Sequence, residues 1–184
     1  MMNLKLFLLS FALWAVPFLL RLSVHIEPVA NDKINTNTNS VVERIVKSID
    51  DNDNTTTFSL IFKNNIKGCL LNVFGGVLLS VGTVVNLLFN GFAAADVFRS
   101  SYDAGLPLAS ILKTTLPHSF ELVGFWLSGA IGFMITWQFV RFMRGKEAFS
   151  PLVLKQIGLL VCVMTVLILG AAYVEAYISV NILK

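Results

Sequence analysis

The chain has 184 residues, of which 55% are hydrophobic and only 14% are charged, and its mean hydropathy is +0.74. This composition excludes an ordinary soluble domain and predicts an integral membrane protein. The net charge is only +3, and the basic residues stand beside apolar runs rather than in a stripe with aromatic residues, which argues against a nucleic-acid partner. Cys69 and Cys162 lie within apolar runs, as small buried residues do, and predict no disulfide or redox site.

Four long apolar segments predict an all-α membrane bundle with about four transmembrane helices. A bilayer core of about 30 Å needs about 20 helical residues to cross it, and helices satisfy their backbone groups in lipid. The first segment has Lys5 ahead of its apolar stretch and imitates a secretory signal, but it is long and lacks a small-residue cleavage site, so we expect an uncleaved helix. We expect the helices at about residues 4–23, 66–92, 118–140 and 152–178.

A polar connector, residues 25–57, separates the first helix segment, residues 1–24, from a membrane core, residues 58–184, with the other three transmembrane helices. Within the connector, apolar residues recur at helical spacing over residues 41–50 while charged residues take the other face. This pattern predicts an amphipathic helix that lies on the membrane surface or on the other helices. Such a helix either spaces two membrane helices or binds a partner.

One side of the predicted second helix is polar. On a helical wheel of about 100° per residue, its amides and small residues fall within one narrow sector. An amide buried in hydrocarbon without a partner is costly, so this side must face protein or water. Helix packing through amide hydrogen bonds is one interpretation, and a polar pathway for a substrate is the alternative. The sector contains Asn65, Asn72, Gly76, Thr83, Asn86 and Asn90.

The predicted third helix carries small residues at intervals of four. Gly124, Ser128 and Gly132 form a ladder that lets another helix approach closely, and Gly129 widens this flat face. We expect the ladder to pack against the polar side of the second helix.

The start of the third helix combines a proline with two ionisable residues. Pro117 suits a first helical turn and sets His118 and Glu121 three positions apart on one face. At the membrane boundary, Glu121 is favoured near the positive helix end, and His118 can bond to it or to a neighbouring helix. A metal site normally needs three or four ligands, and the other histidine, His25, lies in a distant loop. We expect a polar clasp or a partner contact, with no metal, cofactor or catalysis.

Two further segments are expected near the membrane surface. Residues 104–116 contain a Gly-Leu-Pro break and then a short helical stretch, which predicts a surface or re-entrant helix. Glu175, near the end of the fourth helix, stands between Tyr173 and Tyr177 as in an interfacial aromatic belt. We expect Glu175 to lie at the membrane interface.

In this order, the segments resemble the stage II sporulation protein M family of bacterial membrane proteins. The resemblance is carried by "FKNNIKGCLLNVFGGVLLSVGTVVNLLFNG" (62–91), "LPHSFELVGFWLSGAIGF" (116–133) and "AAYVEAYIS" (171–179). Ser119 departs from the glycine that many relatives carry. The positions that match the family's motifs are Phe62, Asn64, Asn65, Asn90, Gly91, Leu116, Pro117, His118, Glu121, Ala172 and Glu175.

The resemblance implies a non-enzymatic, multi-pass protein of the bacterial cytoplasmic (inner) membrane. It implies a scaffold that assembles or anchors a cell-envelope complex, with peptidoglycan hydrolases among its partners besides the lipid bilayer; homo-oligomerisation stays open. The membrane region of the family is also similar to permeases of ABC-type exporters. The alternative is therefore a transport subunit, whose ATPase is a separate polypeptide because this chain lacks a phosphate-binding loop.

The charge pattern predicts an orientation. With four single crossings, the connector, residues 25–57, and the turn between the third and fourth helices share one side of the membrane. Arg141, Arg144, Lys146 and Lys155 cluster around that turn. The positive-inside rule then places both segments in the cytoplasm and both termini outside.

Overall fold

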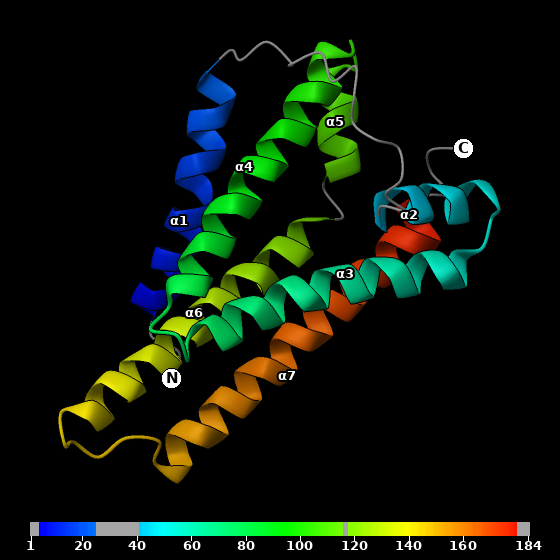
Figure 1. Cartoon of the computed structure of the whole chain (residues 1–184). Coiled ribbons are helices and arrows are strands. Elements are labelled where there is room, and N and C mark those ends of the chain that lie inside the picture. Colours follow the sequence, from blue (N-terminus) through cyan, green and yellow to red (C-terminus); the bar gives the residue numbers. More distant parts are fainter. Residues whose placement is uncertain (1–3, 25–40, 116–117, 180–184) are drawn as a thin grey trace.

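The computed structural model describes residues 4–24, 41–115 and 118–179, and within these ranges the chain is helical and contains no strand (Figure 1). The predicted all-α membrane bundle is confirmed, because four of the helices are long and apolar enough to cross a membrane. They comprise residues Leu4–Ser23, Val81–Asp103, Ser119–Met143 and Pro151–Ile178. The elements in chain order are α1 (Leu4–Ser23), α2 (Val41–Asp50), α3 (Asn54–Gly75), α4 (Val81–Asp103), α5 (Leu108–Thr115), α6 (His118–Met143), α7 (Pro151–Val174) and a π-helical turn, η1 (Glu175–Ser179).

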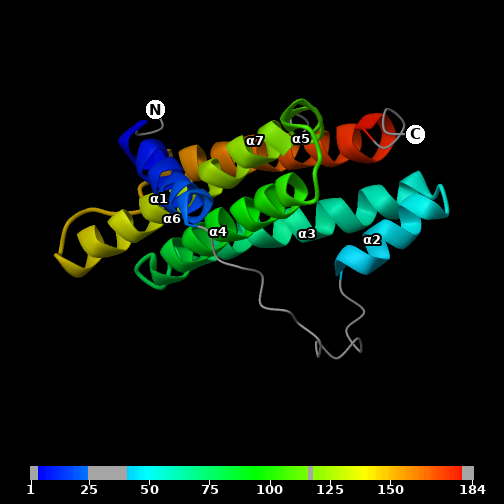
Figure 2. The same cartoon turned by 90° about the horizontal axis from the view of Figure 1, so that it is seen from above.

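Helix α6 lies at the centre of the bundle and contacts α1, α3, α4 and α7. Helices α1 and α4 run side by side in the same direction, and Arg21 of α1 donates to Asp96 of α4 at 2.6 Å. Seen from above, α3 and α4 lie on the same side of α6 and α7 (Figure 2). We call the end of the bundle with the α6–α7 loop, residues 144–150, the loop end, and the opposite end, which holds α2 and α5, the α2 end.

The predicted helix at 66–92 is wrong, because the chain turns back after Gly75 and forms a hairpin of α3 and α4. Two non-glycine residues of the turn, Leu79 and Ser80, have left-handed φ angles of 51° and 64°. The reason for the break is close packing: a side chain at Gly75 would collide with the backbone nitrogen of Thr83. An unbroken helix would separate the two segments and lose this contact.

The left-handed turn can be tested at Leu79, whose side chain is 54% exposed and so contributes little packing. A non-glycine residue in this conformation costs about 1–2 kcal/mol. We expect Leu79→Gly to raise the unfolding free energy by about 0.5–1 kcal/mol and Leu79→Val, with its branched Cβ, to lower it by about 1–2 kcal/mol. Thermal unfolding in detergent measures both. Equal stability of the two variants would contradict the turn geometry.

The hairpin also changes the arrangement of the ends. Helix α1 ends at the α2 end of the bundle, whereas residues 144–150 lie at the loop end (Figure 1). The expectation that the connector and the turn between the third and fourth helices share a side is therefore wrong. Its physical cause is the separate helix α3, which runs from the α2 end to the turn of the hairpin (Figure 1). The prediction of a single helix over 66–92 did not include this reversal.

The corner between α2 and α3 is fixed by short polar side chains. Helix α2 occupies the residues expected for an amphipathic helix, and its buried Ser48 hydroxyl bonds to the Thr57 hydroxyl of α3 at 2.8 Å. Asp53 caps α3, and hydrogen bonds from the hydroxyl and backbone N–H of Thr56 lower its pKa. This cap therefore stabilises the fold above the unfolded-state pKa, and its contribution is lost as the pH falls through the folded-state value.

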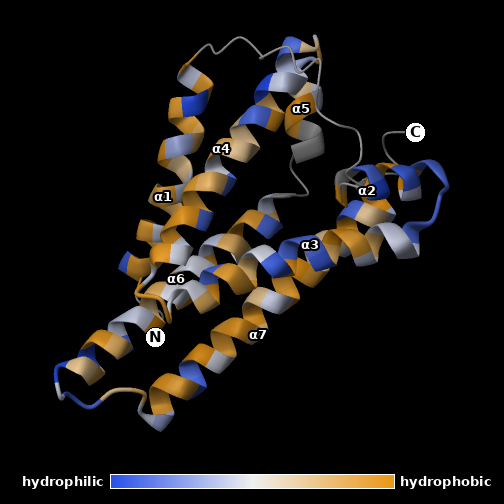
Figure 3. Cartoon of the chain, viewed as in Figure 1, coloured by the Kyte–Doolittle hydropathy of each residue, from blue (hydrophilic) through white to orange (hydrophobic). Residues whose placement is uncertain are grey.

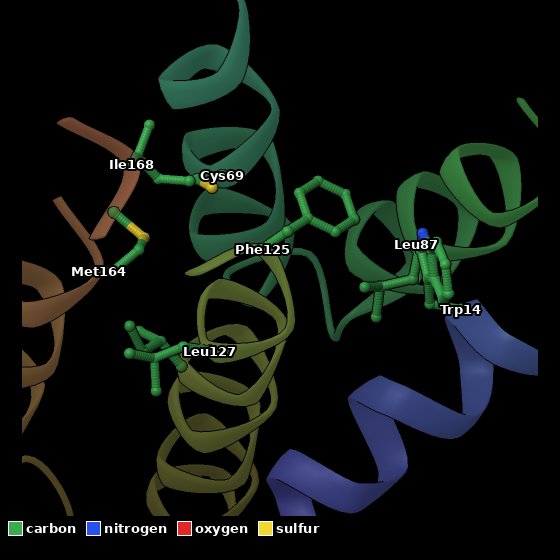
Figure 4. Packing of buried hydrophobic residues seen from close by; sticks show 8 residues of the cluster. Trp14, Cys69, Leu87, Phe125, Leu127, Met164 and Ile168 are labelled. Carbon is green, nitrogen blue, oxygen red and sulfur yellow. The ribbon is translucent and has the colours of Figure 1, made fainter. Parts of the chain in front are cut away.

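Five helices supply the apolar core. Cys69 of α3, Leu87 of α4 and Ile131 of α6 are fully buried, and Trp14 closes the cluster from α1 (Figure 4). Cys162 of α7 is exposed, contrary to the expectation for a small buried residue, because it faces away from α6. The outer helix faces are largely apolar, as lipid contact requires, whereas hydrophilic residues gather at the start of the α6–α7 loop and on one face of α2 (Figure 3).

Candidate functional site

Polar side chains from three helices meet in the apolar interior. Asn72, Thr83 and Ser128 are completely buried, while Asn86 and Asn90 are half-buried. Asn72 comes from α3, Ser128 from α6 and the other three from α4. We call these five residues the amide cluster.

The amide cluster is a continuous chain of hydrogen bonds. Asn90 Nδ2 donates to Asn86 Oδ1 at 3.0 Å, and Asn86 Nδ2 donates to Asn72 Oδ1 at 2.8 Å. Asn72 Nδ2 in turn donates to Ser128 Oγ at 2.9 Å, and Ser128 Oγ donates to the Phe125 carbonyl at 2.6 Å. Each amide thus has a partner, which removes the cost of burying it in an apolar surrounding.

The same residues satisfy backbone groups where α3 and α4 meet. Thr83 Oγ1 donates to the Asn72 carbonyl at 2.7 Å, and Asn86 Nδ2 also donates to the Gly68 carbonyl at 2.9 Å. Thr83, Asn86 and Asn90 stand three and four residues apart, so one face of α4 presents all of them. These bonds fix α4 against α3, and the bond between Asn72 and Ser128 fixes the hairpin against α6.

Asn72 allows a direct test of this cluster. We expect Asn72→Ala to lower the unfolding free energy by about 2 kcal/mol, since it opens a cavity and removes bonds to two other helices. Asn64→Ala is the matched control, because Asn64 lies on the same helix, is exposed and makes only a 3.3 Å bond to its neighbour Asn65. Its effect should stay within about 0.5 kcal/mol. Unfolding in detergent compares the pair, and equal losses would contradict a structural role for the cluster.

A second set of contacts fixes the turn of the hairpin to α6. Thr136 Oγ1 donates to the Gly76 carbonyl at 2.7 Å, and the hydroxyls of Ser80 and Thr136 are hydrogen-bonded to each other. A side chain at Gly76 would collide with the backbone of Gly132. Ser80 and Thr136 did not stand out in the sequence, although Thr136 continues the four-residue spacing of the ladder.

The small-residue ladder does not form one groove, because its members contact different helices. Ser128 and Gly132 lie against the hairpin, where Gly132 approaches the Asn72 carbonyl and Thr83. A Cβ at Gly124 would instead lie 2.9 Å from Ile168 of α7. Gly129 packs against Ser10 of α1 and Leu87 of α4. Spacing identified close contacts but not their partners.

Gly91 allows a close contact between α4 and α1. A Cβ added to Gly91 would collide with the carbonyl oxygen of Trp14 and would come within 2.9 Å of the Pro17 ring. The family motif position Asn90-Gly91 thus combines a hydrogen bond within α4 with a close helix contact.

The ionisable motif residues lie at the α2 end. Glu121 is in the first turn of α6 and Glu175 begins η1, and both are half-buried. His118 begins α6, but its side chain and Pro117 lie outside the described residues. Within residues 4–24, 41–115 and 118–179, no three His, Cys, Asp or Glu side chains are close enough together to hold a metal ion.

An aromatic cluster lies beside Glu175. Tyr173 and Tyr177 stack with ring centroids 4.8 Å apart, and Tyr177 lies 6.4 Å from Phe58 of α3. Phe58 stacks on Phe62 at 6.2 Å. These rings tie the end of α7 to the first turns of α3.

The loop end carries a strong excess of basic residues. Glu147 is the one acidic residue among the charged positions of α6, the loop and α7 at this end. The basic residues are Arg141, Arg144, Lys146 and Lys155.

Comparison with known sequences identifies the family. The profile described as "Stage II sporulation protein M" matches residues 4–180. The chain is similar to an uncharacterized protein of Methanocaldococcus jannaschii, with 31% identity over 129 residues that cover 68% of this chain and 72% of that protein. No solved structure matches the chain. This membrane protein belongs to the stage II sporulation protein M family.

Proposed function

We propose that this protein is a non-enzymatic scaffold of the cytoplasmic (inner) membrane that assembles or anchors a cell-envelope complex, with peptidoglycan hydrolases as the partner class. The family is not known for an enzymatic activity. The observation that carries the proposal is the closed amide cluster. Its donors and acceptors bond to one another across α3, α4 and α6, so they hold helices in place.

The charges support an orientation for the scaffold. The loop end has four basic residues and one acidic residue within residues 141–155, and we assign this short, dense basic cluster to the cytoplasmic side. The basic residues of the α2 end, among them Arg21, Arg44, Lys47 and Arg99, are spread over several segments. The α2 end then faces the outside, where envelope proteins are found. This orientation replaces the one in which both termini lie outside.

Helix α2 is the proposed docking element. It lies outside the four candidate membrane spans, yet Val41 and Val46 are 42% and 51% exposed. Beside it, a pocket of about 490 Å³ opens at the corner with α3. A partner can bury the valines and place a polar side chain in this pocket. Its lining residues are Arg44, Lys47, Ser48, Asp51, Asp53, Thr56 and Leu60.

Cysteine labelling tests the orientation. In a background with Cys69→Ser and Cys162→Ser, we expect Asp51→Cys to react with a membrane-impermeant maleimide added outside intact cells. Gly145→Cys should react only after the cytoplasm is opened. Both positions are exposed in the structure, so access depends on the side of the membrane. The reverse pattern, or labelling of both from one side, would contradict the orientation.

Affinity purification in mild detergent tests the function. The wild-type chain should co-purify with a peptidoglycan hydrolase or another envelope protein, identified by mass spectrometry. The double variant Val41→Asn/Val46→Asn should lose that partner. Leu106→Asn/Leu108→Asn is the matched control, since these leucines are about half exposed and also lie at the α2 end. Equal recovery with all three chains would reject docking on α2.

The alternative is a permease-like subunit of an ABC-type exporter that works with a separate ATPase. It is favoured by Asn86 and Asn90, which are only half-buried and so line the edge of the amide cluster. Under this alternative the same purification recovers an ATP-binding protein in place of an envelope protein. Asn90→Leu should then reduce transport without loss of the fold.

A further inference from the structure

The uncharged lengths of α6 and α7 set the position of the membrane. Residues 122–140 and 156–174 contain no Asp, Glu, Lys or Arg. At 1.5 Å per residue each stretch is about 28 Å long, close to the hydrocarbon thickness of about 30 Å. Each is bounded by a glutamate at the α2 end and by a basic residue, Arg141 or Lys155, at the loop end. The two helices therefore agree on where the hydrocarbon ends.

The turn of the α3–α4 hairpin does not reach that boundary. It contacts α6 at Gly132 and Thr136, and Thr136 is five residues before Arg141, or about 8 Å along the helix. Figure 1 shows α6 and α7 extending beyond the turn toward the loop end. The turn thus ends within the hydrocarbon, and acyl chains must cover its side chains. Those that are at least half exposed are Val77, Leu78, Leu79 and Val81.

The α6–α7 loop beyond the turn has a fixed shape. The Phe149 ring packs edge-on against Phe139, with centroids 5.1 Å apart, and the Phe149 N–H donates to Gln138 Oε1 at 3.4 Å. Gly145, with φ of 66°, reverses the chain after α6. Because the loop is held back against α6 by Phe149, Arg144 and Lys146 are left exposed.

We propose that the loop end binds an anionic phospholipid, with the headgroup phosphate on the basic residues and the acyl chains against the hairpin turn. Arg141, Arg144, Lys146 and Lys155 outnumber Glu147 at the level where a headgroup lies. Guanidinium and ammonium groups form charge-assisted hydrogen bonds with phosphate oxygens. The turn supplies an apolar surface about 8 Å deeper along α6, at the level of the acyl chains of the same leaflet. This combination of charge and depth fits a lipid rather than a soluble anion.

The test uses the purified full chain in a non-ionic detergent, titrated with phosphatidylglycerol or with phosphatidylcholine. Phosphatidylglycerol should raise the unfolding temperature in a saturable way, and phosphatidylcholine should not. Arg144→Gln/Lys146→Gln should weaken the apparent affinity about 30-fold, since each basic residue near an anionic headgroup strengthens binding about fivefold. Lys63→Gln/Lys67→Gln, two exposed lysines of α3, is the matched control and should remain within twofold of wild type.

Three results would overturn the proposal. One is an equal loss in both double variants, which would indicate unspecific charge attraction. Another is an unchanged affinity of Arg144→Gln/Lys146→Gln. The third is an equal stabilisation by inorganic phosphate alone, which would indicate a site for free phosphate. We expect the variants to fold, because the substituted residues are exposed. Their unfolding temperatures without lipid check this.

Discussion

Gly132→Ala is expected to lower the unfolding free energy by about 3 kcal/mol or more. The added methyl group would collide with the backbone carbonyl of Asn72 and lie 2.7 Å from Thr83 Oγ1. A carbonyl within a helix cannot rotate away, so the hairpin must separate from α6. That separation also breaks the bond between Asn72 and Ser128 and the contact of Gly76 with Gly132.

Two other glycines of the chain supply the controls. Gly158 and Gly170 lie within α7, and nothing stands within 4 Å of a Cβ placed on either of them. We expect Gly158→Ala and Gly170→Ala to be neutral or to stabilise the chain by up to about 1 kcal/mol, as helix propensity predicts. Thermal unfolding in detergent and gel filtration measure all three variants. A loss at Gly158 equal to that at Gly132 would show that packing of the hairpin is not the cause.

Composition and apolar length were enough to predict the helical membrane fold, because lipid permits so few alternatives. They could not show that the chain turns at Gly75 and Gly76. An apolar run of this length suits one long helix as well as a hairpin, and glycine is common within membrane helices. The deciding contacts, Gly75 with Thr83 and Gly76 with Gly132, join residues of separate helices. A local pattern carries no information about them.

The polar side of the predicted helix illustrates the same limit. The wheel grouped Asn72 with Thr83, Asn86 and Asn90 as one face of a continuous rod. They do come together, but across two helices, with Asn86 bonded to Asn72. The need of buried amides for partners survives a wrong helix boundary, because it follows from the cost of leaving them unpaired. Which helix supplies the partner follows only from the tertiary fold.

Leu78→Arg, at the turn of the hairpin, is expected to cost about 3 kcal/mol, because a charge would be moved into hydrocarbon. Phe142→Arg is the matched control. Leu78 and Phe142 are 69% and 67% exposed, so neither change disturbs the core. They differ in depth, since Phe142 lies next to Arg141 at the edge of the membrane.

The amount of chain that integrates into membranes and stays folded in detergent measures the difference between these variants. We expect Leu78→Arg to reduce it severely and Phe142→Arg to leave it near the wild-type level. If both arginines are tolerated equally, the turn reaches water, and the acyl-chain contact proposed for the loop end is lost with it. If both are harmful, the hydrocarbon boundary lies beyond Arg141. Only an unequal outcome agrees with a hairpin that ends inside the bilayer, about two helical turns short of the α6–α7 loop.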